Sequence, residues 1–240
     1  MIWLRSALFA AALAITTPVF SFIALATFPF DALTRYRIIT QWSRITIFLA
    51  RVICGIRYQV LGRERLPTRP SVVLSKHQSA WETLAFQEIF PPQVIVVKKS
   101  LLYIPFFGWG LAMLSPIVVD RTSLRTSLKQ LLRQGMARLA AGFWVIVYPE
   151  GRRVDPGERG RYQVGGAWLA VHAGAPVVPV AVNAGRLWGR RAFLKRPGRV
   201  TVSIGEPIDP RGLKPEEVLR RAEEWIEAEM RRIDAAPQER

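Results

Sequence analysis

A histidine and a glutamate five positions apart carry the chemistry that this sequence suggests most directly. They are His77 and Glu82. A neutral imidazole can take a proton from an alcohol with one ring nitrogen, while a carboxylate that holds the other N–H fixes the tautomer and stabilises the imidazolium. An isolated pair of this kind is more often a histidine at a helix start with local hydrogen bonds. The interpretation of His77 as a general base therefore depends on a second motif.

The second motif is the segment Tyr148–Arg153, which contains Glu150, Gly151, Arg152 and Arg153. Arginine binds phosphate through two parallel hydrogen bonds, and glycine lets the backbone approach a ligand closely. We interpret the segment as a cradle for a phosphate group. A solvated basic loop is the alternative for any one such site. Further cations follow two other predicted strands and could join the cradle: Lys98, Lys99 and Arg121.

The elements that position these motifs are short β-branched runs with helical patterns between them. The predicted strands are Tyr58–Val60, Val72–Leu74, Val94–Val97, Ile117–Val119, Trp144–Tyr148, Val177–Val182 and Val200–Ile204, and the clearest helices are Thr122–Ala141 and Pro215–Ile233. This alternation predicts an α/β fold with a mixed, largely parallel sheet flanked by helices. Ligands bind beyond the carboxyl ends of such strands, so both motifs are expected at the same edge.

An uncharged segment near the amino terminus predicts membrane association. Residues 6–30 contain no charged side chain, and as a helix they would extend roughly 37 Å, enough for a bilayer core of about 30 Å. A cleaved signal peptide is the alternative, although the apolar run is longer than its usual core. Arg35, Arg37, Arg44 and Arg51 follow the segment, which places the body of the protein in the cytoplasm.

A second amino-terminal helix is predicted over Tyr36–Gly55, with apolar side chains on one face and arginines on another. This pattern suits an interfacial helix and equally an ordinary core helix. We therefore divide the chain into an anchor with interfacial helix, residues 1–57, and an α/β domain, residues 58–240. The first segment could span the bilayer or lie in one leaflet.

The composition points to an anionic partner. Lysine and arginine number 34 against 18 acidic residues in 240, a net charge of +16. Such a surplus suits acidic lipid, an acidic protein or nucleic acid. The basic residues are spread among apolar strands without aromatic stacking platforms, so nucleic acid is not expected. Cys54 is the only cysteine, which excludes an intrachain disulfide and a multi-cysteine metal site.

At these motifs the chain resembles the lysophospholipid acyltransferases, most closely the bacterial 1-acyl-glycerol-3-phosphate acyltransferases. Four blocks match in order between about Val72 and Asn183. The family's Asn-His-x-Ser-x-x-Asp block corresponds to Lys76–Glu82, and its Phe-Pro-Glu-Gly-Thr-Arg block corresponds to Tyr148–Arg153. A block handling the acceptor phosphate corresponds to Val97–Leu101, Pro105–Trp109 and Asp120–Arg121, which adds Gly108. The fourth, a proline-flanked apolar strand, is Ala175–Val180.

Three departures from the family pattern stand out. Glu82 replaces aspartate, Lys76 replaces asparagine and Arg152 replaces threonine. None removes a function from the proposed chemistry. The apolar segment Leu101–Trp109 is open to two interpretations, an acyl-chain tunnel or lipid contact on one side and core packing on the other.

The resemblance implies an acyltransferase of the inner membrane with its catalytic domain facing the cytoplasm. It would move a fatty acyl group from acyl-CoA or acyl carrier protein to the 2-hydroxyl of 1-acyl-glycerol 3-phosphate (lysophosphatidic acid), giving phosphatidic acid. His77 and Glu82 would be catalytic. The substrate-binding residues would be Lys98, Gly108, Arg121, Glu150, Gly151, Arg152 and Arg153. No metal or cofactor is expected beyond the thioester co-substrate, and anionic membrane lipid is an expected partner.

Two other functions remain open. One is a related acyltransferase with another lyso-lipid acceptor, such as lyso-ornithine lipid. The other is a non-catalytic basic protein that binds membranes. Motifs of other enzyme classes are missing from the sequence: the Gly-x-Ser-x-Gly elbow, the Walker A loop, Gly-x-Gly-x-x-Gly and His-Glu-x-x-His.

Overall fold

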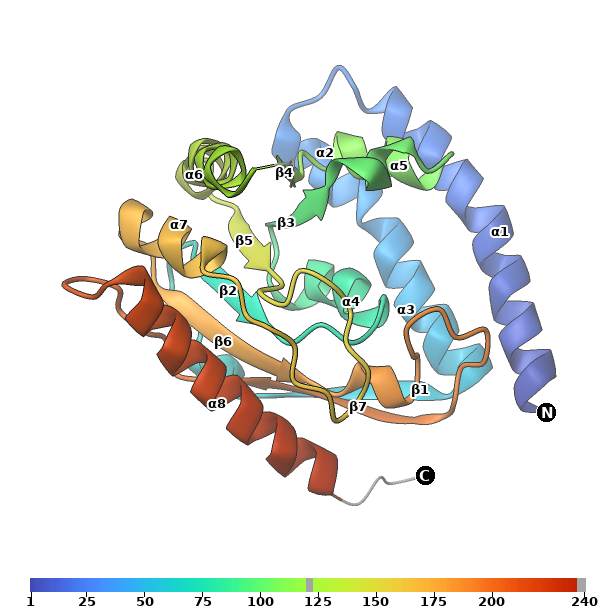
Figure 1. The fold of residues 1–240 in the computed structure, drawn as a ribbon. Helices are drawn as coiled ribbons and strands as arrows, with labels where there is room; N and C mark the ends of the chain where they lie inside the picture. The colour runs from blue at the N-terminus through green and yellow to red at the C-terminus, as the bar shows by residue number, and fades with distance from the viewer. Residues whose placement is uncertain (120–122, 237–240) are drawn as a thin grey trace.

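The computed structural model describes residues 1–119 and 123–236. Within these residues seven strands form one sheet in the order β1-β7-β6-β2-β5-β3-β4 (Figure 1). They are β1 (Ile56–Leu61), β2 (Val72–Ser75), β3 (Gln93–Lys98), β4 (Ile117–Val119), β5 (Trp144–Val147), β6 (Val177–Val182) and β7 (Gly198–Ile204). Neighbours pair in parallel except β6 with β7, so β1 and β7 run against the other five. The predicted mixed, largely parallel α/β fold is confirmed.

Helices cover both faces of this sheet (Figure 1). They are α1 (Ile2–Ala26), α2 (Ala32–Ile39), α3 (Gln41–Cys54), α4 (Trp81–Ile89), α5 (Phe107–Met113), α6 (Leu124–Ala140), α7 (Gly165–Ala173) and α8 (Pro215–Ala235). Because side chains alternate along a strand, Val73 of β2 packs with α3 and α4, while Val72 and Leu74 pack with α7 and α8. The strands are apolar on both sides because both faces are buried.

The predicted helix over Tyr36–Gly55 is wrong as a single element, because two helices meet at Thr40. The hydroxyl of Thr40 donates to the carbonyl oxygen of Tyr36 at 2.7 Å, a back-bond that bends helices. The first of the two also begins earlier, where the Asp31 carboxylate accepts the backbone N–H groups of Leu33 and Thr34. The second helix ends at Gly55, which adopts a left-handed conformation.

The amino-terminal helix α1 lies along the domain, where it packs on α3 and α5. Phe9 is buried and meets Trp188 edge to face at 5.2 Å, and the Ser6 hydroxyl accepts the backbone N–H of Lys195. By length and composition alone the helix could cross a membrane. Residues 1–57 thus contact the α/β part closely, and their division from residues 58–240 stays a prediction.

Candidate active site

The two motifs leave the same edge of the sheet. β2 ends at Ser75 and β5 ends at Val147, and these strands are parallel neighbours. The turn that carries His77 and the loop that carries Arg153 therefore begin side by side. Two backbone contacts then tie the turn to the loop: the N–H of His77 donates to Glu150 Oε2 at 3.0 Å, and the N–H of Val154 donates to the carbonyl oxygen of His77 at 2.9 Å.

His77 and Glu82 form a hydrogen-bonded couple. Nδ1 of His77 lies 2.9 Å from Oε1 of Glu82, whose side chain is completely buried in the first turn of α4. The same oxygen accepts the backbone N–H groups of Gln78 at 2.8 Å and Ser79 at 2.6 Å. The carboxylate oxygen is an acceptor, so the tautomer that fits this contact donates its N–H from Nδ1. Nε2 is left to act as a base.

An apolar cavity of about 170 Å³ opens beside this couple. His77, Tyr148 and Arg153 line it together. Its apolar walls come from the amino-terminal helices, from α4 and β3, and from the segment at α5: Phe20, Ile39, Trp42, Leu84, Ile95, Val97, Leu101, Phe107, Leu111 and Leu114. A base, a cation and an apolar chamber thus share one space.

Within the segment Leu101–Trp109, some residues line the cavity, some are exposed and one is closely packed. Leu101 and Phe107 line the cavity, whereas Tyr103 is 71% exposed and Trp109 is 40% exposed on the outer surface. Gly108 is buried inside α5 and does not line the cavity. A Cβ at Gly108 would lie 2.3 Å from the carbonyl oxygen of Leu102, so close packing explains this glycine.

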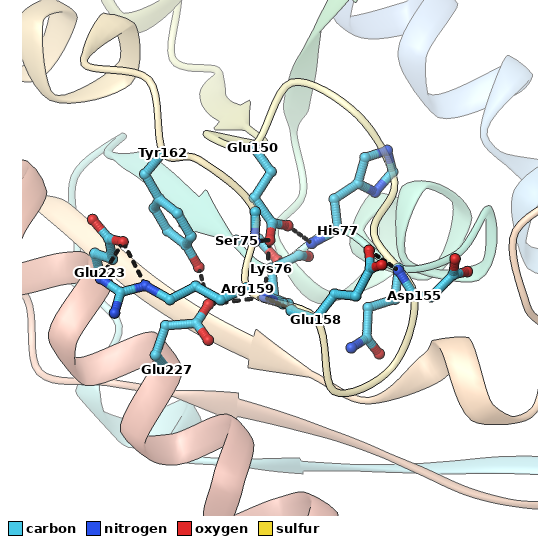
Figure 2. A network of polar contacts seen from close by, with 12 residues as sticks. Ser75, Lys76, His77, Glu150, Asp155, Glu158, Arg159, Tyr162, Glu223 and Glu227 are labelled. Carbon is cyan, nitrogen blue, oxygen red and sulfur yellow. Dashed lines mark hydrogen bonds and ion pairs between the residues drawn. The ribbon is translucent and has the colours of Figure 1, made fainter.

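Glu150 faces the interior of the protein. Its side chain is fully buried, with Oε1 bound to the Lys76 ammonium at 2.8 Å and to the backbone N–H of Gly160 at 3.2 Å (Figure 2). Burial raises the pKa of Glu150, and the hydrogen bonds from Lys76, His77 and Gly160 oppose that shift. The structure thus places Glu150 where it shapes the site through the backbone of His77. Gly151 lines a second cavity, of about 340 Å³, with Pro149 and Glu150.

The remaining predicted substrate-binding residues lie farther out or outside the described part of the chain. Lys98 ends β3 and is exposed, one residue past the cavity-lining Val97. Arg152 is exposed and Arg153 is half-buried. Arg121 lies outside the described residues. The geometry therefore brings together His77, Glu82 and Arg153, and the roles assigned to the whole set stay predictions.

Several residues at the site were not predicted from the sequence. Tyr148 stacks on His77, and burial raises its pKa well above the ordinary value. Glu227 of α8 and Tyr162 join the cluster around Lys76 (Figure 2). Two features of the sequence could have pointed to this cluster: Tyr148 lies within the second motif, and Lys76 directly precedes His77. Glu227 lies on an amphipathic helix far along the chain, and nothing in its local sequence indicates a contact with Lys76.

Base, cation and apolar chamber together suit a transferase that moves an acyl group to an alcohol. The chain belongs to the acyltransferase family, since the family model described as Acyltransferase matches residues 57–183. A 1-acyl-sn-glycerol-3-phosphate acyltransferase of Pseudomonas aeruginosa is 45% identical over 222 residues, covering 91% of this chain and 86% of that protein. The alpha form from Mus musculus is 29% identical over 180 residues, with 73% of this chain and 63% of that protein covered.

A solved structure has the same fold. The crystal structure of the 1-acyl-sn-glycerophosphate (LPA) acyltransferase PlsC from Thermotoga maritima superposes with a TM-score of 0.80. The match covers 99% of this chain and 98% of that one at 21% sequence identity. The helix α1, which packs on α3 and α5, is thus part of a fold shared along nearly the whole chain.

Proposed function

We propose that this acyltransferase transfers a fatty acyl group to the 2-hydroxyl of 1-acyl-glycerol 3-phosphate and so forms phosphatidic acid. The observation that carries the proposal is that His77, already paired with Glu82, shares its apolar cavity with Arg153. The names of the P. aeruginosa and mouse relatives support the same acceptor. The acyl donor is a thioester, either acyl-CoA or acyl carrier protein.

In the reaction, Nε2 of His77 takes the proton of the 2-hydroxyl while Glu82 stabilises the imidazolium that forms. The oxygen attacks the thioester carbonyl, the new C–O bond forms and the C–S bond breaks. His77 then returns the proton to the departing thiolate. Arg153 holds the phosphate of the acceptor, with Lys98, Arg121 and Arg152 as further cations. The apolar cavity receives an acyl chain, and no metal or cofactor takes part.

We also propose that the enzyme lies on the cytoplasmic surface of the inner membrane. The outward side of α1 and α3 exposes large apolar residues: Trp3, Leu4, Leu8, Ile15, Phe22, Phe48 and Val52. Beside them, Arg5, Arg51, Arg57 and Arg199 line a hollow of about 380 Å³ that suits anionic headgroups. Because α1 packs along the domain, it enters one leaflet as part of this surface.

Vesicle binding tests the membrane proposal. Arg51→Gln/Arg57→Gln should weaken salt-sensitive binding to vesicles containing phosphatidylglycerol, because two cations of the hollow are lost. Arg161→Gln/Arg231→Gln removes two exposed arginines away from the hollow and serves as the matched control. Equal losses in both double variants would contradict a specific membrane-facing surface.

The release of thiol from acyl-CoA or acyl carrier protein, measured with different lyso-lipid acceptors, tests the reaction. We expect turnover with 1-acyl-glycerol 3-phosphate that is lost in His77→Ala. The matched control is His172→Ala, because His172 is the only other histidine and is exposed at the end of α7. Turnover confined to lyso-ornithine lipid, or no thiol release with any acceptor, would reject the proposed function.

A further inference from the structure

A fully buried lysine lies immediately before the base. The Lys76 side chain is 1% exposed, and its ammonium contacts three acceptors: Glu150 Oε1 at 2.8 Å, Glu227 Oε1 at 2.8 Å and the Glu158 carbonyl oxygen at 2.9 Å. The three donors of the ammonium thus match three acceptors, two from the loop between β5 and α7 and one from α8. Figure 2 shows the imidazole of His77 directed away from this cluster.

The cluster reaches the base through Glu150. One oxygen of this carboxylate holds Lys76, and the other accepts the backbone N–H of His77 at 3.0 Å. The position of His77 therefore depends on the orientation of Glu150, which Lys76 fixes. Lys76 is in turn fixed by Glu227, which also accepts the hydroxyl of Tyr162 at 2.9 Å. A continuous chain of contacts joins α8 to the base.

The buried cluster of Lys76, Glu150 and Glu227 has an unbalanced charge. Two carboxylates and one ammonium leave one excess negative charge in a buried site, and burying an ion pair yields little net stability. Removing one partner of such a cluster, however, leaves an uncompensated charge and releases the other groups. Such a cluster suits positioning better than stabilisation. An asparagine at this position would be too short to replace the ammonium at all three acceptors.

We propose that Lys76 and Glu227 are positioning residues for acyl transfer, which hold Glu150 and through it the backbone of His77 in the reactive geometry. The inference rests on the proposed function, because the base must be His77 for its placement to matter. A displacement of about 1 Å at a reacting group can lower the rate about a hundredfold. Loss of this hold should therefore reduce kcat more than it changes the acceptor KM.

The primary variant is Glu227→Gln, which keeps the shape of the side chain and removes its charge. We expect kcat to fall by about tenfold or more, with the acceptor KM within about threefold of wild type. Glu223→Gln is the matched control on the same helix. Glu223 lies one turn earlier, pairs with Arg159 at 2.7 Å and has no contact with Lys76, so kcat should remain at the wild-type value.

The pH profile separates positioning from general destabilisation. The charged and titratable groups around His77 are Glu82 from α4, Tyr148 and Arg153 from the loop after β5, and the cluster of Lys76, Glu150 and Glu227. Loss of a nearby cation favours the imidazolium, and loss of an anion disfavours it. The acid limb of the pH profile of kcat/KM reports protonation of the base His77. This limb should move to higher pH in Lys76→Met and to lower pH in Glu227→Gln.

A double variant completes the test. Lys76→Met/Glu227→Gln restores the net charge of the cluster, so the acid limb should return toward that of wild type while kcat stays low. Wild-type kcat in Glu227→Gln, or a lowered thermal midpoint without any change in kcat or the acid limb, would overturn the proposal.

Should Glu227→Gln fail to fold, Tyr162→Phe takes its place, since it removes one contact to Glu227. We expect about a threefold loss of kcat, and wild-type kcat there would also overturn it. If the wild-type enzyme itself transfers no acyl group, the proposed function is rejected, and not only the positioning role of Lys76 and Glu227.

Discussion

The ring of Tyr148 lies 3.9 Å from the ring of His77, with the two planes inclined by only 18°. The stack limits rotation of the imidazole while Glu82 holds its Nδ1 from the edge. Glu82 and Tyr148 thus fix the base from two directions. Their contributions can be separated by substitution, because one is electrostatic and the other is steric.

For Tyr148 we expect Phe and Ala to differ sharply. Tyr148→Phe keeps the stacked ring, so kcat should stay within about threefold of wild type. Tyr148→Ala removes the ring, and kcat should fall about tenfold. Thiol-release assays at saturating acceptor measure both. A larger loss in Tyr148→Phe than in Tyr148→Ala would show that the hydroxyl, and not the stack, matters.

Glu82→Gln should lower kcat about a hundredfold, because the neutral amide cannot stabilise the imidazolium. Glu82→Asp keeps the charge but shortens the side chain by one methylene. The turn is set for glutamate by the N–H groups of Gln78 and Ser79, so we expect an intermediate loss of about tenfold. Circular dichroism checks that both variants fold. A fully active Glu82→Gln would contradict the role of the carboxylate.

The two adjacent arginines should behave differently. Arg153→Ala should raise the acceptor KM about tenfold with little change in kcat, because a phosphate contact far from the reacting carbonyl gives uniform binding. Arg152→Ala should raise the acceptor KM by less, since Arg152 is only a further cation, is exposed and does not line the cavity. Initial rates over a range of acceptor concentrations measure both. Equal changes in KM would place the phosphate elsewhere.

The raised pKa of Glu150 predicts a pH dependence of stability. Because burial raises this pKa, Glu150 binds a proton more tightly in the folded state than in the unfolded chain, so its contribution to stability is complete below the pKa of an unfolded glutamate. That contribution is lost as the pH rises through the folded pKa. Glu150→Gln has no such loss. The thermal midpoint of the variant minus that of wild type should therefore increase from about pH 4 to about pH 8. A constant difference would contradict the shift.

Local patterns predicted most of the fold. All seven predicted runs form strands, because residues such as Val73 and Ile146 are buried between two helical layers and leave a continuous apolar signal. The direction of β7 was not predictable, since a buried strand has the same apolar pattern whether it pairs in parallel or antiparallel. The bend at Thr40 also escaped, because a threonine bonded back to Tyr36 looks like an ordinary helical residue in the sequence.

The site was predictable only where its residues are close in the chain. The spacing of His77 and Glu82 reflects one turn and the start of one helix, so sequence alone indicated the couple. The contact between Lys76 and Glu227 joins residues 151 positions apart. Such a pair depends on how α8 crosses the sheet, which no local pattern encodes. Arg153 lies between these cases, since parallel neighbouring strands made its approach to His77 predictable.

The pairing of β1 with β7 bears on how the chain is assembled during synthesis. β1 follows the amino-terminal helices directly, yet its partner strand belongs to a much later part of the chain. The same late region supplies Trp188 and Lys195, which contact α1. Until the ribosome has released that region, the edge of β1 has no strand partner and the part of α1 around Ser6 and Phe9 lacks its contacts with Lys195 and Trp188. The lipid surface is then available to this part of the apolar helix. Adsorption to the bilayer can thus precede completion of the enzyme, so a nascent chain would reach its site of action before it is able to work.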